Sequence, residues 1–320
     1  MPRVLITGIT GFAGSHLAEH LVERGAEVHG LAHEDPPYSN IAAVADRVRI
    51  HRGDVTNVGD LGSALGASRA DAVVHLAGMA VPTLATADPV AAVRVNVLGT
   101  ASVLKALEDH PRTALVLASS ADVYGAPDRV PVDEDAPLRP GNVYSATKVA
   151  AEGIARDFAA RRQVPVVILR PANQNGPRQH PGLAASAFAK QIAEAEAGLA
   201  EPVIKHGRLD AERDFVDVRD MARAYAAALA LEEGGTFKVG SGRAVAIAEI
   251  LDTLIALARV PVRAELDQTR VRGGEPTRIA LDVTRFRQKT GWSPRIALAD
   301  SLRDTLDHWR SVRARQGARV

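Results

Sequence analysis

The stretch Gly8-Ile9-Thr10-Gly11-Phe12-Ala13-Gly14 decides the fold of this chain. It follows the apolar run Val4-Leu5-Ile6, which is typical of a buried strand, and precedes an apolar pattern at helical spacing over residues 17–22. A dinucleotide-binding fingerprint requires this order of strand, glycine turn and helix, because glycines let the backbone approach a pyrophosphate and the helix N-terminus offers it N–H groups. The spacing is G-x-x-G-x-x-G rather than G-x-G-x-x-G, so a plain glycine loop remains the alternative.

Apolar, β-rich runs alternate with helical patterns through the first half of the chain. We expect strands near residues 3–7, 27–32, 48–52, 71–76, 113–118 and 164–170, and helices near 12–24, 57–66, 88–109 and 142–162. This alternation predicts an α/β fold, a Rossmann-type doubly wound parallel sheet with helices on both faces. The continuous apolar runs 72–74 and 115–117 are what strands buried on both faces require.

The regularity breaks after Arg170-Pro171, since residues 171–185 contain three Pro and two Gly. Helical patterns follow near 183–197, 247–258 and 297–313, and residues 237–239 read as a strand. We therefore expect a dinucleotide-binding domain over 1–170 with a return segment near 214–242. Residues 171–213 and 243–320 are expected to form a smaller, α-rich portion.

Composition excludes several classes of function. The 320 residues are 46% hydrophobic and only 4% aromatic, with a formal net charge of +1, so nucleic acid is not an expected partner. The chain has no Cys, hence no disulfides or thiolate ligands. His16 and His20 have a chelating spacing without an evident third ligand, so we expect a solvated helix face and no metal. The N-terminus enters a strand at once and no apolar run approaches membrane-spanning length, which predicts a cytoplasmic protein.

Tyr144 and Lys148 are four residues apart, which places both side chains on one face of a helix. An ammonium beside a phenol lowers the pKa of the phenol and makes it usable for proton transfer near neutral pH. The spacing alone is weak evidence, because motifs this short arise by chance.

Further motifs occur in order along the chain: Asp54-Val55, His75-Leu76-Ala77-Gly78, Asn96-Val97-Leu98-Gly99-Thr100, Ser119-Ser120-Ala121-Asp122-Val123-Tyr124-Gly125, Arg170-Pro171-Ala172-Asn173, the run 213–220 and Thr290-Gly291-Trp292-Ser293-Pro294. Together with the glycine turn and the Tyr144–Lys148 pair, they resemble the extended short-chain dehydrogenase/reductases, in the branch that modifies nucleotide sugars. The resemblance covers essentially the whole chain. Within the branch, residues 119–125 and 188–192 are most similar to the GDP-4-keto-6-deoxy-mannose reductases, which make GDP-rhamnose.

The resemblance implies a set of catalytic roles. Tyr144 would be the general acid that protonates the sugar 4-oxygen, Lys148 would lower its pKa and hold the nicotinamide ribose, and Ser120 would polarise the carbonyl. An isolated serine of this kind is more often a turn or cap residue. Relatives that dehydrate sugars carry an acidic pair, or Thr with Glu, where this chain has Ala121 and Asp122. Asp122 would then contact the sugar, or be a solvated residue at the strand end.

The fingerprint and the resemblance together imply the residues that bind the cofactor: Gly8, Thr10, Gly11, Phe12, Ala13, Gly14, His33, Asp54, Val55, Leu76, Ala77, Gly78, Asn96, Ser119, Tyr144, Lys148 and Pro171. The second strand ends at Ala32-His33 without an acidic residue at its tip, so NADP(H) is favoured over NAD(H). His33 and Arg52 are the nearest candidate contacts for a 2′-phosphate, although His33 is equally a solvated loop residue. A structural hydrogen bond is the alternative for Asn96.

The residues that the resemblance assigns to the substrate are Asp122, Asn173, Lys190, Arg213, Arg272 and Glu275. Lys190 and Arg213 would bind the diphosphate, because a guanidinium can bridge two phosphate oxygens and an ammonium acts as a point charge. Arg272 is equally a solvated loop residue. Residues 172–178 depart from the reductases, which usually place a large aromatic at 172 and His at 174, so the hexose and the base stay open.

The expected activity is NAD(P)H-dependent reduction of the 4-keto group of a nucleotide 4-keto-6-deoxyhexose, with GDP-4-keto-6-deoxy-mannose favoured. The alternatives are a 4-epimerase, a 4,6-dehydratase or a decarboxylase that returns its hydride to the product. A non-catalytic sensor on this fold would be expected to lose Tyr144 or Lys148. The resemblance also suggests a homodimer through the helices near 88–109 and 142–162, where Ala150, Ala151, Ile154 and Phe158 would pack unless they face the sheet.

Overall fold

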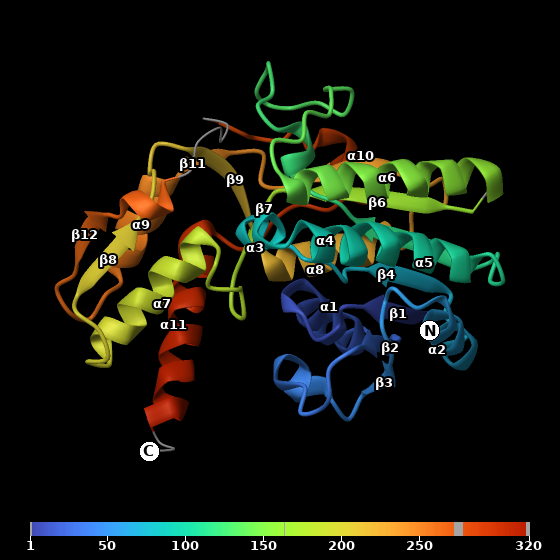
Figure 1. Ribbon diagram of the computed structural model, residues 1–320, viewed down its shortest axis with the longest axis horizontal. Coiled ribbons are helices and arrows are strands. Elements are labelled where there is room, and N and C mark those ends of the chain that lie inside the picture. Colours follow the sequence, from blue (N-terminus) through green and yellow to red (C-terminus); the bar gives the residue numbers. More distant parts are fainter. Residues whose placement is uncertain (1, 163, 272–277, 318–320) are drawn as a thin grey trace.

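A seven-stranded parallel sheet forms the centre of the larger part of the molecule (Figure 1). The computed structural model describes residues 2–162, 164–271 and 278–317. The sheet order is β10-β6-β5-β4-β1-β2-β3, and the strands are β1 (Arg3–Thr7), β2 (Glu27–Ala32), β3 (Val48–Arg52), β4 (Ala72–His75), β5 (Ala114–Ala118), β6 (Val166–Pro171) and β10 (Gly235–Val239). The predicted doubly wound sheet is confirmed. The order reverses between β1 and β4, where such sheets bind ligands at the carboxyl ends of their strands.

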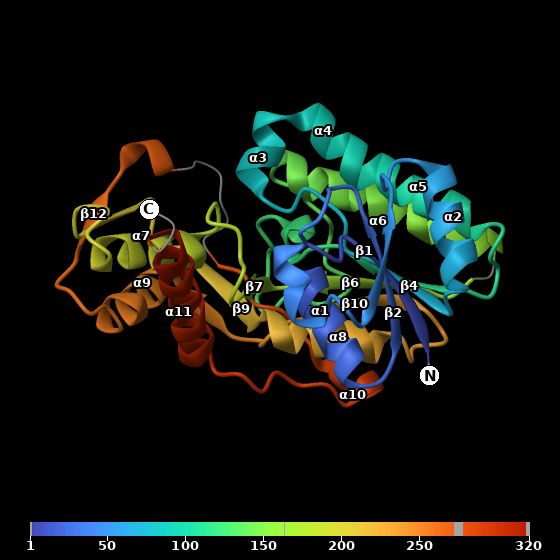
Figure 2. The same ribbon diagram turned by 90° about the horizontal axis from the view of Figure 1, so that it is seen from below.

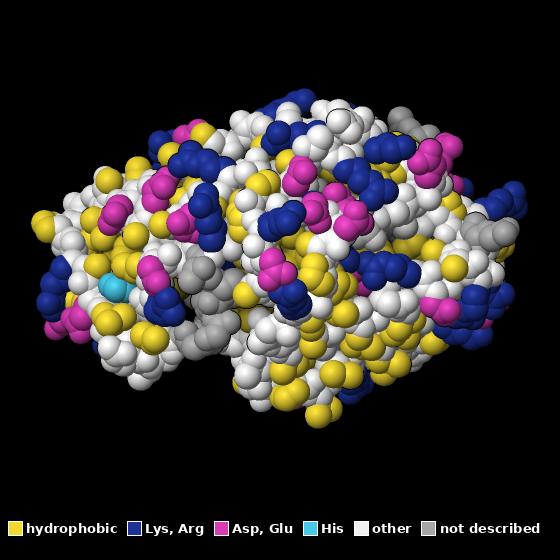
Figure 3. All heavy atoms as spheres, turned by 90° about the horizontal axis from the view of Figure 1, so that it is seen from above, with side chains coloured by type: hydrophobic (Ala, Val, Ile, Leu, Met, Phe, Trp, Pro, Cys, Tyr) yellow, Lys and Arg dark blue, Asp and Glu magenta, His cyan; other side chains and the backbone are white. Residues whose placement is uncertain are grey.

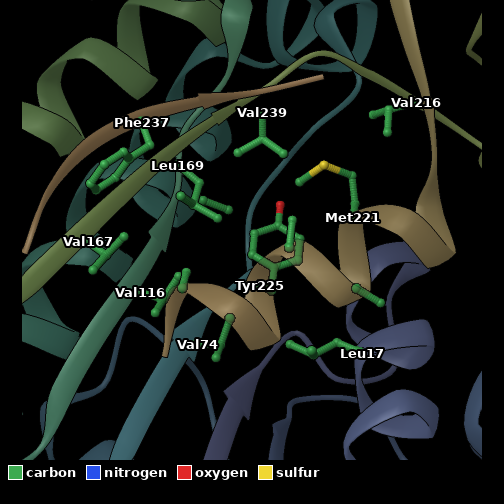
Figure 4. Packing of buried hydrophobic residues seen from close by; sticks show 14 of the residues in the cluster. Leu17, Val74, Val116, Val167, Leu169, Val216, Met221, Tyr225, Phe237 and Val239 are labelled. Carbon is green, nitrogen blue, oxygen red and sulfur yellow. The ribbon is translucent and has the colours of Figure 1, made fainter. Parts of the chain in front are cut away.

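Helices cover both faces of this sheet (Figures 1 and 2). One face carries α1 (Phe12–Glu23), the short helix η1 (Ser39–Val44) and α8 (Val218–Ala228), and the other carries α2 (Val58–Ser68), α5 (Gly99–Leu107) and α6 (Val143–Arg162). Side chains alternate between the faces, because Val4 and Ile6 join one hydrophobic cluster while Leu5 joins the other. Figure 4 shows Tyr225 of α8 packed beneath Leu169 and Val239 in the first of these clusters.

The smaller part consists of helices packed on two short sheets. Its elements are β7 (Asn173–Asn175), α7 (Ala184–Glu196), β8 (Val203–His206), β9 (Glu212–Asp217), β11 (Ala244–Ala246), α9 (Ile247–Ala256), β12 (Arg263–Leu266), the short helix η4 (Gln268–Arg270) and α11 (Leu298–Gly317). The strands β11, β9 and β7 form one sheet, and β8 pairs with β12. The three helices agree with the prediction, whereas the short strands were not predicted.

The C-terminal segment departs from the predicted division of the chain. Helix α10 (Thr284–Thr290) packs on β10 of the large sheet. Phe286 lies 5.9 Å from Phe237 and 5.7 Å from Trp292, measured between ring centroids, and all three rings belong to the cluster that contains Val4. Residues 279–292 therefore contribute to the dinucleotide-binding side, because their aromatic side chains complete its core.

The predicted helix near 88–109 consists of several pieces. After α3 (Pro82–Ala87) come α4 (Pro89–Val93), a π-helical turn η2 (Arg94–Leu98) and α5, and the Asp88 carboxylate caps α4 by accepting from the Ala91 N–H at 2.9 Å. The 19 residues Pro89–Leu107 are long and apolar enough to cross a membrane by length and composition alone, so the prediction that no run approaches that length is wrong. Half of the segment is buried inside the protein, while Val90, Val93 and Leu98 are exposed.

Candidate active site

The glycine turn after β1 has the geometry of a pyrophosphate cradle. Gly8 adopts a φ of +72°, and a Cβ at Gly14 would lie 2.1 Å from the Gly8 carbonyl oxygen. Gly11 is the N-cap residue of α1 and has no side chain to cap the first turn. A helix N-terminus that its cap residue leaves uncapped offers N–H groups to an anion, which fits the diphosphate of a dinucleotide. The strand–turn–helix context of the fingerprint is confirmed.

The loop after β2 surrounds this turn with polar groups. The Asn40 amide donates to the Thr10 carbonyl at 2.8 Å, and the Glu34 carboxylate is hydrogen-bonded to the Thr10 side chain. His33 is 83% exposed, with Nδ1 3.1 Å from Glu34 Oε2. The tip of β2 carries no acid, which favours NADP. The structure brings Glu34 back against the glycine turn, and this carboxylate weakens the preference for NADP.

Asp54, the predicted adenine acceptor, follows β3. Its Oδ1 accepts from the Thr56 N–H at 2.8 Å and the Thr56 hydroxyl at 2.9 Å, and Oδ2 lies 3.6 Å from the Arg94 guanidinium. The hydrogen bonds from Thr56 and the charge of Arg94 hold the pKa of this carboxyl below its usual range. Asp54 is thus an ionised acceptor near neutral pH.

Ser120, Tyr144 and Lys148 lie together at the carboxyl end of β5. Ser120 lies two residues beyond the end of the strand, and its hydroxyl is hydrogen-bonded to Tyr144 while accepting from the Asp122 N–H at 3.1 Å. Both side chains of the α6 pair are buried, and the Lys148 ammonium donates to the Ala118 carbonyl at 2.8 Å. The Lys148 Nζ is 6.0 Å from the centroid of the Tyr144 ring. Ser120 therefore acts as a cap and also faces the phenol.

Burial controls the pKa values of this pair. The pKa of Tyr144 is raised, first by burial and then by the Asp122 carboxylate, while the hydrogen bond from Ser120 opposes the shift. The pKa of Lys148 is lowered to about 8 by burial, against the charge of Glu152. The net shift of the Tyr144 pKa is opposite in direction to the expected one, because desolvation dominates and the Lys148 ammonium donates to the Ala118 carbonyl. The phenol therefore holds its proton at neutral pH, and burial makes it a weaker acid than an exposed phenol.

The predicted substrate residues come from several elements of the smaller part. Asn173 on β7 and Arg213 on β9 lie on neighbouring strands, and the Arg213 guanidinium donates to the Glu212 carbonyl at 2.9 Å. Lys190 on α7 lies 3.3 Å from Glu194. Arg272 and Glu275 lie outside the described residues. The strands β7 and β9 therefore bring an amide and a guanidinium to the same small sheet.

Known proteins resemble this chain over nearly its full length. The family model described as GDP-mannose 4,6 dehydratase matches residues 5–305. The chain belongs to this family of extended short-chain dehydrogenase/reductases. The resemblance read from the sequence is confirmed, and the protein is an NAD(P)-dependent enzyme of this type.

Three comparisons, one of sequence and two of structure, are informative about function. The chain is 33% identical to the GDP-6-deoxy-D-mannose reductase of Pseudomonas aeruginosa, over 97% of each protein. The structure of RMD from Pseudomonas aeruginosa complexed with NADPH matches with a TM-score of 0.83 at 31% identity, covering 98% of this chain and 100% of that one. The Thermus thermophilus UDP-glucose 4-epimerase in complex with NAD matches with a TM-score of 0.86 at 30% identity, covering 96% and 99%. Reductase and epimerase relatives thus share this fold.

Two other residues predicted to bind the cofactor, Asn96 and Ser119, make side-chain hydrogen bonds inside the protein. The Asn96 amide, in the π-helical turn, accepts from the Met79 N–H at 2.7 Å and donates to the Thr147 hydroxyl at 2.9 Å. This arrangement favours the structural alternative, in which Asn96 fixes the turn after Gly78. The Ser119 hydroxyl donates to Glu152 in the interior, so a contact with the cofactor would come from its backbone. The remaining predicted residues, Val55, Leu76, Ala77 and Pro171, follow or end β3, β4 and β6.

Arg178 has a role that the sequence did not reveal. Its φ is +72°, and its guanidinium pairs with both Glu19 oxygens at 2.6 and 2.7 Å and with His16. Burial and Arg178 lower the pKa of His16 to about 4. The expectation of a solvated His16 is wrong, because this side chain is buried against the 177–178 loop. Among the described residues, no group of three or more His, Asp or Glu is placed to hold a metal ion.

A cavity of about 480 Å³ lies beside this contact, between α1, η1, the 177–178 loop and α11. Tyr144 and Lys148 do not line it. The candidate catalytic residues therefore lie at the carboxyl edge of the sheet and not in this cavity.

Proposed function

We propose that the protein uses NAD(P)H to reduce the 4-keto group of a nucleotide 4-keto-6-deoxyhexose, and that GDP-4-keto-6-deoxy-mannose is reduced to GDP-rhamnose. The observation that carries this proposal is a protonated, buried Tyr144 hydrogen-bonded to Ser120, with Asp122 as the carboxylate beside it and a buried Ala at 121. Removal of water from a sugar needs an acid and a base, and the 120–124 segment supplies one carboxylate. The similarity to the GDP-6-deoxy-D-mannose reductase supports the choice of substrate.

The residues would divide the reaction among them. When bound, NAD(P)H would supply the hydride that the carbonyl carbon accepts. Tyr144 gives its phenolic proton to the carbonyl oxygen, and the Ser120 hydroxyl donates to the same oxygen as negative charge develops on it. Lys148 would hold the nicotinamide ribose with its ammonium. The oxygen thus becomes a hydroxyl, and the proton lost by Tyr144 returns from solvent.

A hydride-returning enzyme is the second candidate, because the Thermus thermophilus UDP-glucose 4-epimerase matches the fold equally well. Such an epimerase, dehydratase or decarboxylase keeps its nicotinamide and shows no net oxidation. Net consumption of the reduced cofactor therefore separates the two candidates.

Incubation with GDP-4-keto-6-deoxy-mannose and NADPH is expected to consume one NADPH for each GDP-deoxyhexose formed. The measurement follows nicotinamide absorbance and identifies the product by mass spectrometry and NMR. No oxidation with this substrate or with its dTDP and UDP counterparts would reject the reductase assignment. Release of a 4-epimer or a dehydrated sugar without NADPH consumption would support the second candidate.

NADP(H) is the proposed cofactor. The similarity to the RMD complex with NADPH supports it, as does the end of β2 at Ala32, where His33 is exposed and the Arg52 guanidinium pairs with Asp35. The Glu34 carboxylate opposes the binding of NADP(H), since a carboxylate repels a 2′-phosphate.

In the same assay, kcat/KM for NADPH is expected to exceed that for NADH by at least about tenfold, or 1.4 kcal/mol. Equal values of kcat/KM for NADPH and NADH would contradict the proposed preference for NADP(H).

The apparent affinity for NADPH should fall as the pH rises through about 8. The pKa of Lys148 is lowered to about 8 by burial, so its ammonium is present below that pH and is lost above it. The expected profile of kcat/KM for NADPH is flat near neutral pH and declines with a slope of about one per pH unit on the alkaline side, because this parameter reports the free enzyme. A profile that stays flat to pH 10 would contradict the role of Lys148.

A homodimer through α4, α5 and α6 is the proposed assembly. Val90 is 79% exposed and Val93 50%. In Figure 3 hydrophobic side chains gather over this side of the molecule, in the lower part of the view. An exposed apolar face of this kind marks an interaction surface. Of the residues predicted to pack there, Ala151 and Phe158 are buried, Phe158 in a core cluster of the sheet, and Ile154 packs against the same cluster, which leaves Ala150 exposed.

Replacing Val93 by Glu is expected to convert the dimer to a monomer. A charge in an apolar interface is desolvated without a partner, which opposes association. Analytical ultracentrifugation of both proteins at micromolar concentration measures the mass. The matched control is Leu199→Glu, which changes a 65% exposed residue of the smaller part and should remain dimeric. A monomeric wild-type protein at these concentrations would contradict the proposal.

A further inference from the structure

A buried ionic cluster lies directly behind the catalytic residues. Glu152, on α6 one turn after Lys148, is fully buried and binds the Arg170 guanidinium through two hydrogen bonds, Nε to Oε1 at 2.9 Å and Nη2 to Oε2 at 2.6 Å. Arg170 also donates to the Tyr124 hydroxyl at 2.7 Å. Glu152, Arg170 and Tyr124 are called the Glu152 cluster below. Every polar atom of the carboxylate has a partner, as a stable buried ion pair requires.

The Glu152 cluster connects the segments that carry the catalytic set. The Ser119 hydroxyl donates to Glu152, and Ser119 precedes the catalytic Ser120. Arg170 is the penultimate residue of β6, and Tyr124 is the last residue of the short helix η3 (Ala121–Tyr124) that carries Asp122. One carboxylate therefore holds β5, β6, η3 and α6 in register around the reaction centre.

The charge of Glu152 also faces Lys148. Burial disfavours the ammonium, and the Glu152 carboxylate opposes that effect. The other ionisable groups around the ammonium are His75 on β4, whose pKa is lowered to about 3 by burial and Lys148 so that it stays neutral, and Tyr144 on α6, whose pKa is raised. On the far side of Glu152, Arg170 and the partly exposed Arg156 are both positive. Glu152 is thus the negative group among three cations.

We propose that Glu152 is a positioning residue for the reaction, which orders the segments bearing Ser120 and Lys148 and supplies the negative charge that keeps the Lys148 ammonium available to the nicotinamide ribose. This inference rests on the role given to Lys148 in the proposed function. It assigns a catalytic consequence to a residue that touches neither the substrate nor the cofactor. A purely structural ion pair would stabilise the fold without setting the charge state of Lys148.

The test compares Glu152→Gln with Arg156→Gln, which remove opposite charges from the same helix face. The measurement is the dissociation constant of NADPH from pH 6 to 10, followed by nicotinamide fluorescence. In Glu152→Gln the alkaline loss of affinity should begin about one pH unit lower than in the wild type. In Arg156→Gln, which keeps the carboxylate, the loss should begin at the same pH or higher. A loss that begins at an unchanged pH in Glu152→Gln, or at a lower pH in Arg156→Gln, would overturn the inference.

Glu152→Asp provides a second variant in case the glutamine protein does not fold. It keeps the charge but shortens the side chain, so the two hydrogen bonds to Arg170 cannot both persist. We expect NADPH to bind at least fivefold more weakly at pH 7 in this variant than in Arg156→Gln, and equal affinities would overturn the inference. Because NADPH binding needs no sugar, these outcomes remain readable if the reductase assignment fails. Conversely, an active reductase with an unshifted profile would reject only the role of Glu152.

Discussion

Replacing Tyr144 by Phe is expected to lower kcat by about 10³-fold or more, within the range that a lost general acid produces. The change removes the hydroxyl that is hydrogen-bonded to Ser120 and keeps the ring, which packs against Ala85 and Ala92. Binding of NADPH should stay within about threefold of the wild-type affinity, a difference below 1 kcal/mol. Steady-state kinetics with the ketosugar and fluorescence titration with NADPH measure the two quantities.

The control for this variant is Tyr225→Phe. Tyr225 is also buried, on α8, and its hydroxyl is hydrogen-bonded to Gln174 but has no role in the proposed reaction. If loss of any buried phenol hydroxyl damaged the enzyme, both variants would lose activity together. Turnover that survives in Tyr144→Phe would show that another group gives the proton, and Asp122 would be the first candidate because it is the neighbouring carboxylate.

The sequence predicted the large sheet well because its central strands β1, β4 and β5 contain continuous apolar runs. The expected strands at 27–32 and 48–52 coincide with β2 and β3, and the others agree within about two residues. The short strands β7 and β11 were missed, since three residues are too few to show a period. Helix α8 was also missed, because residues 218–228 were read only as part of a return segment.

The candidate site was predictable where its residues lie in short sequence motifs. The glycine turn, Ser120 and the Tyr144–Lys148 pair lie as expected, since each occupies the end of a strand or the start of a helix. The pKa of Tyr144 was misjudged because the sequence shows the neighbouring charge but not the burial that outweighs it.

The role of Glu152 was not predicted, for a related reason. Lys148, Glu152 and Arg156 follow one another at four-residue intervals, which reads as an ordinary charged helix face. Glu152 belongs to a buried ionic cluster because it binds Arg170. Arg170 lies on β6, and no local sequence pattern shows that this strand packs beside α6.

Replacing Gly14 by Ala is expected to weaken NADPH binding at least about 100-fold, equivalent to about 2.7 kcal/mol. A methyl group at this position would lie 2.1 Å from the Gly8 carbonyl oxygen and 2.8 Å from the Ile9 Cα. Both contacts are with backbone atoms, so rotating a side chain cannot relieve them. The glycine turn must therefore move away from α1, and the cradle for the pyrophosphate opens. Overpacking of this kind should also lower the free energy of unfolding by about 1–3 kcal/mol.

Gly62→Ala is the matched control, because it makes the same chemical change in the interior of another helix of the same sheet. A Cβ at Gly62 meets nothing within 4 Å, so this variant should raise the free energy of unfolding by about 0.5–1 kcal/mol through the lower entropy of the unfolded chain. Urea unfolding and NADPH titration of both variants measure the two effects. If Gly14→Ala binds NADPH as tightly as Gly62→Ala does, the diphosphate does not bind at the glycine turn, and the assignment of residues 8–14 as the cofactor cradle is wrong.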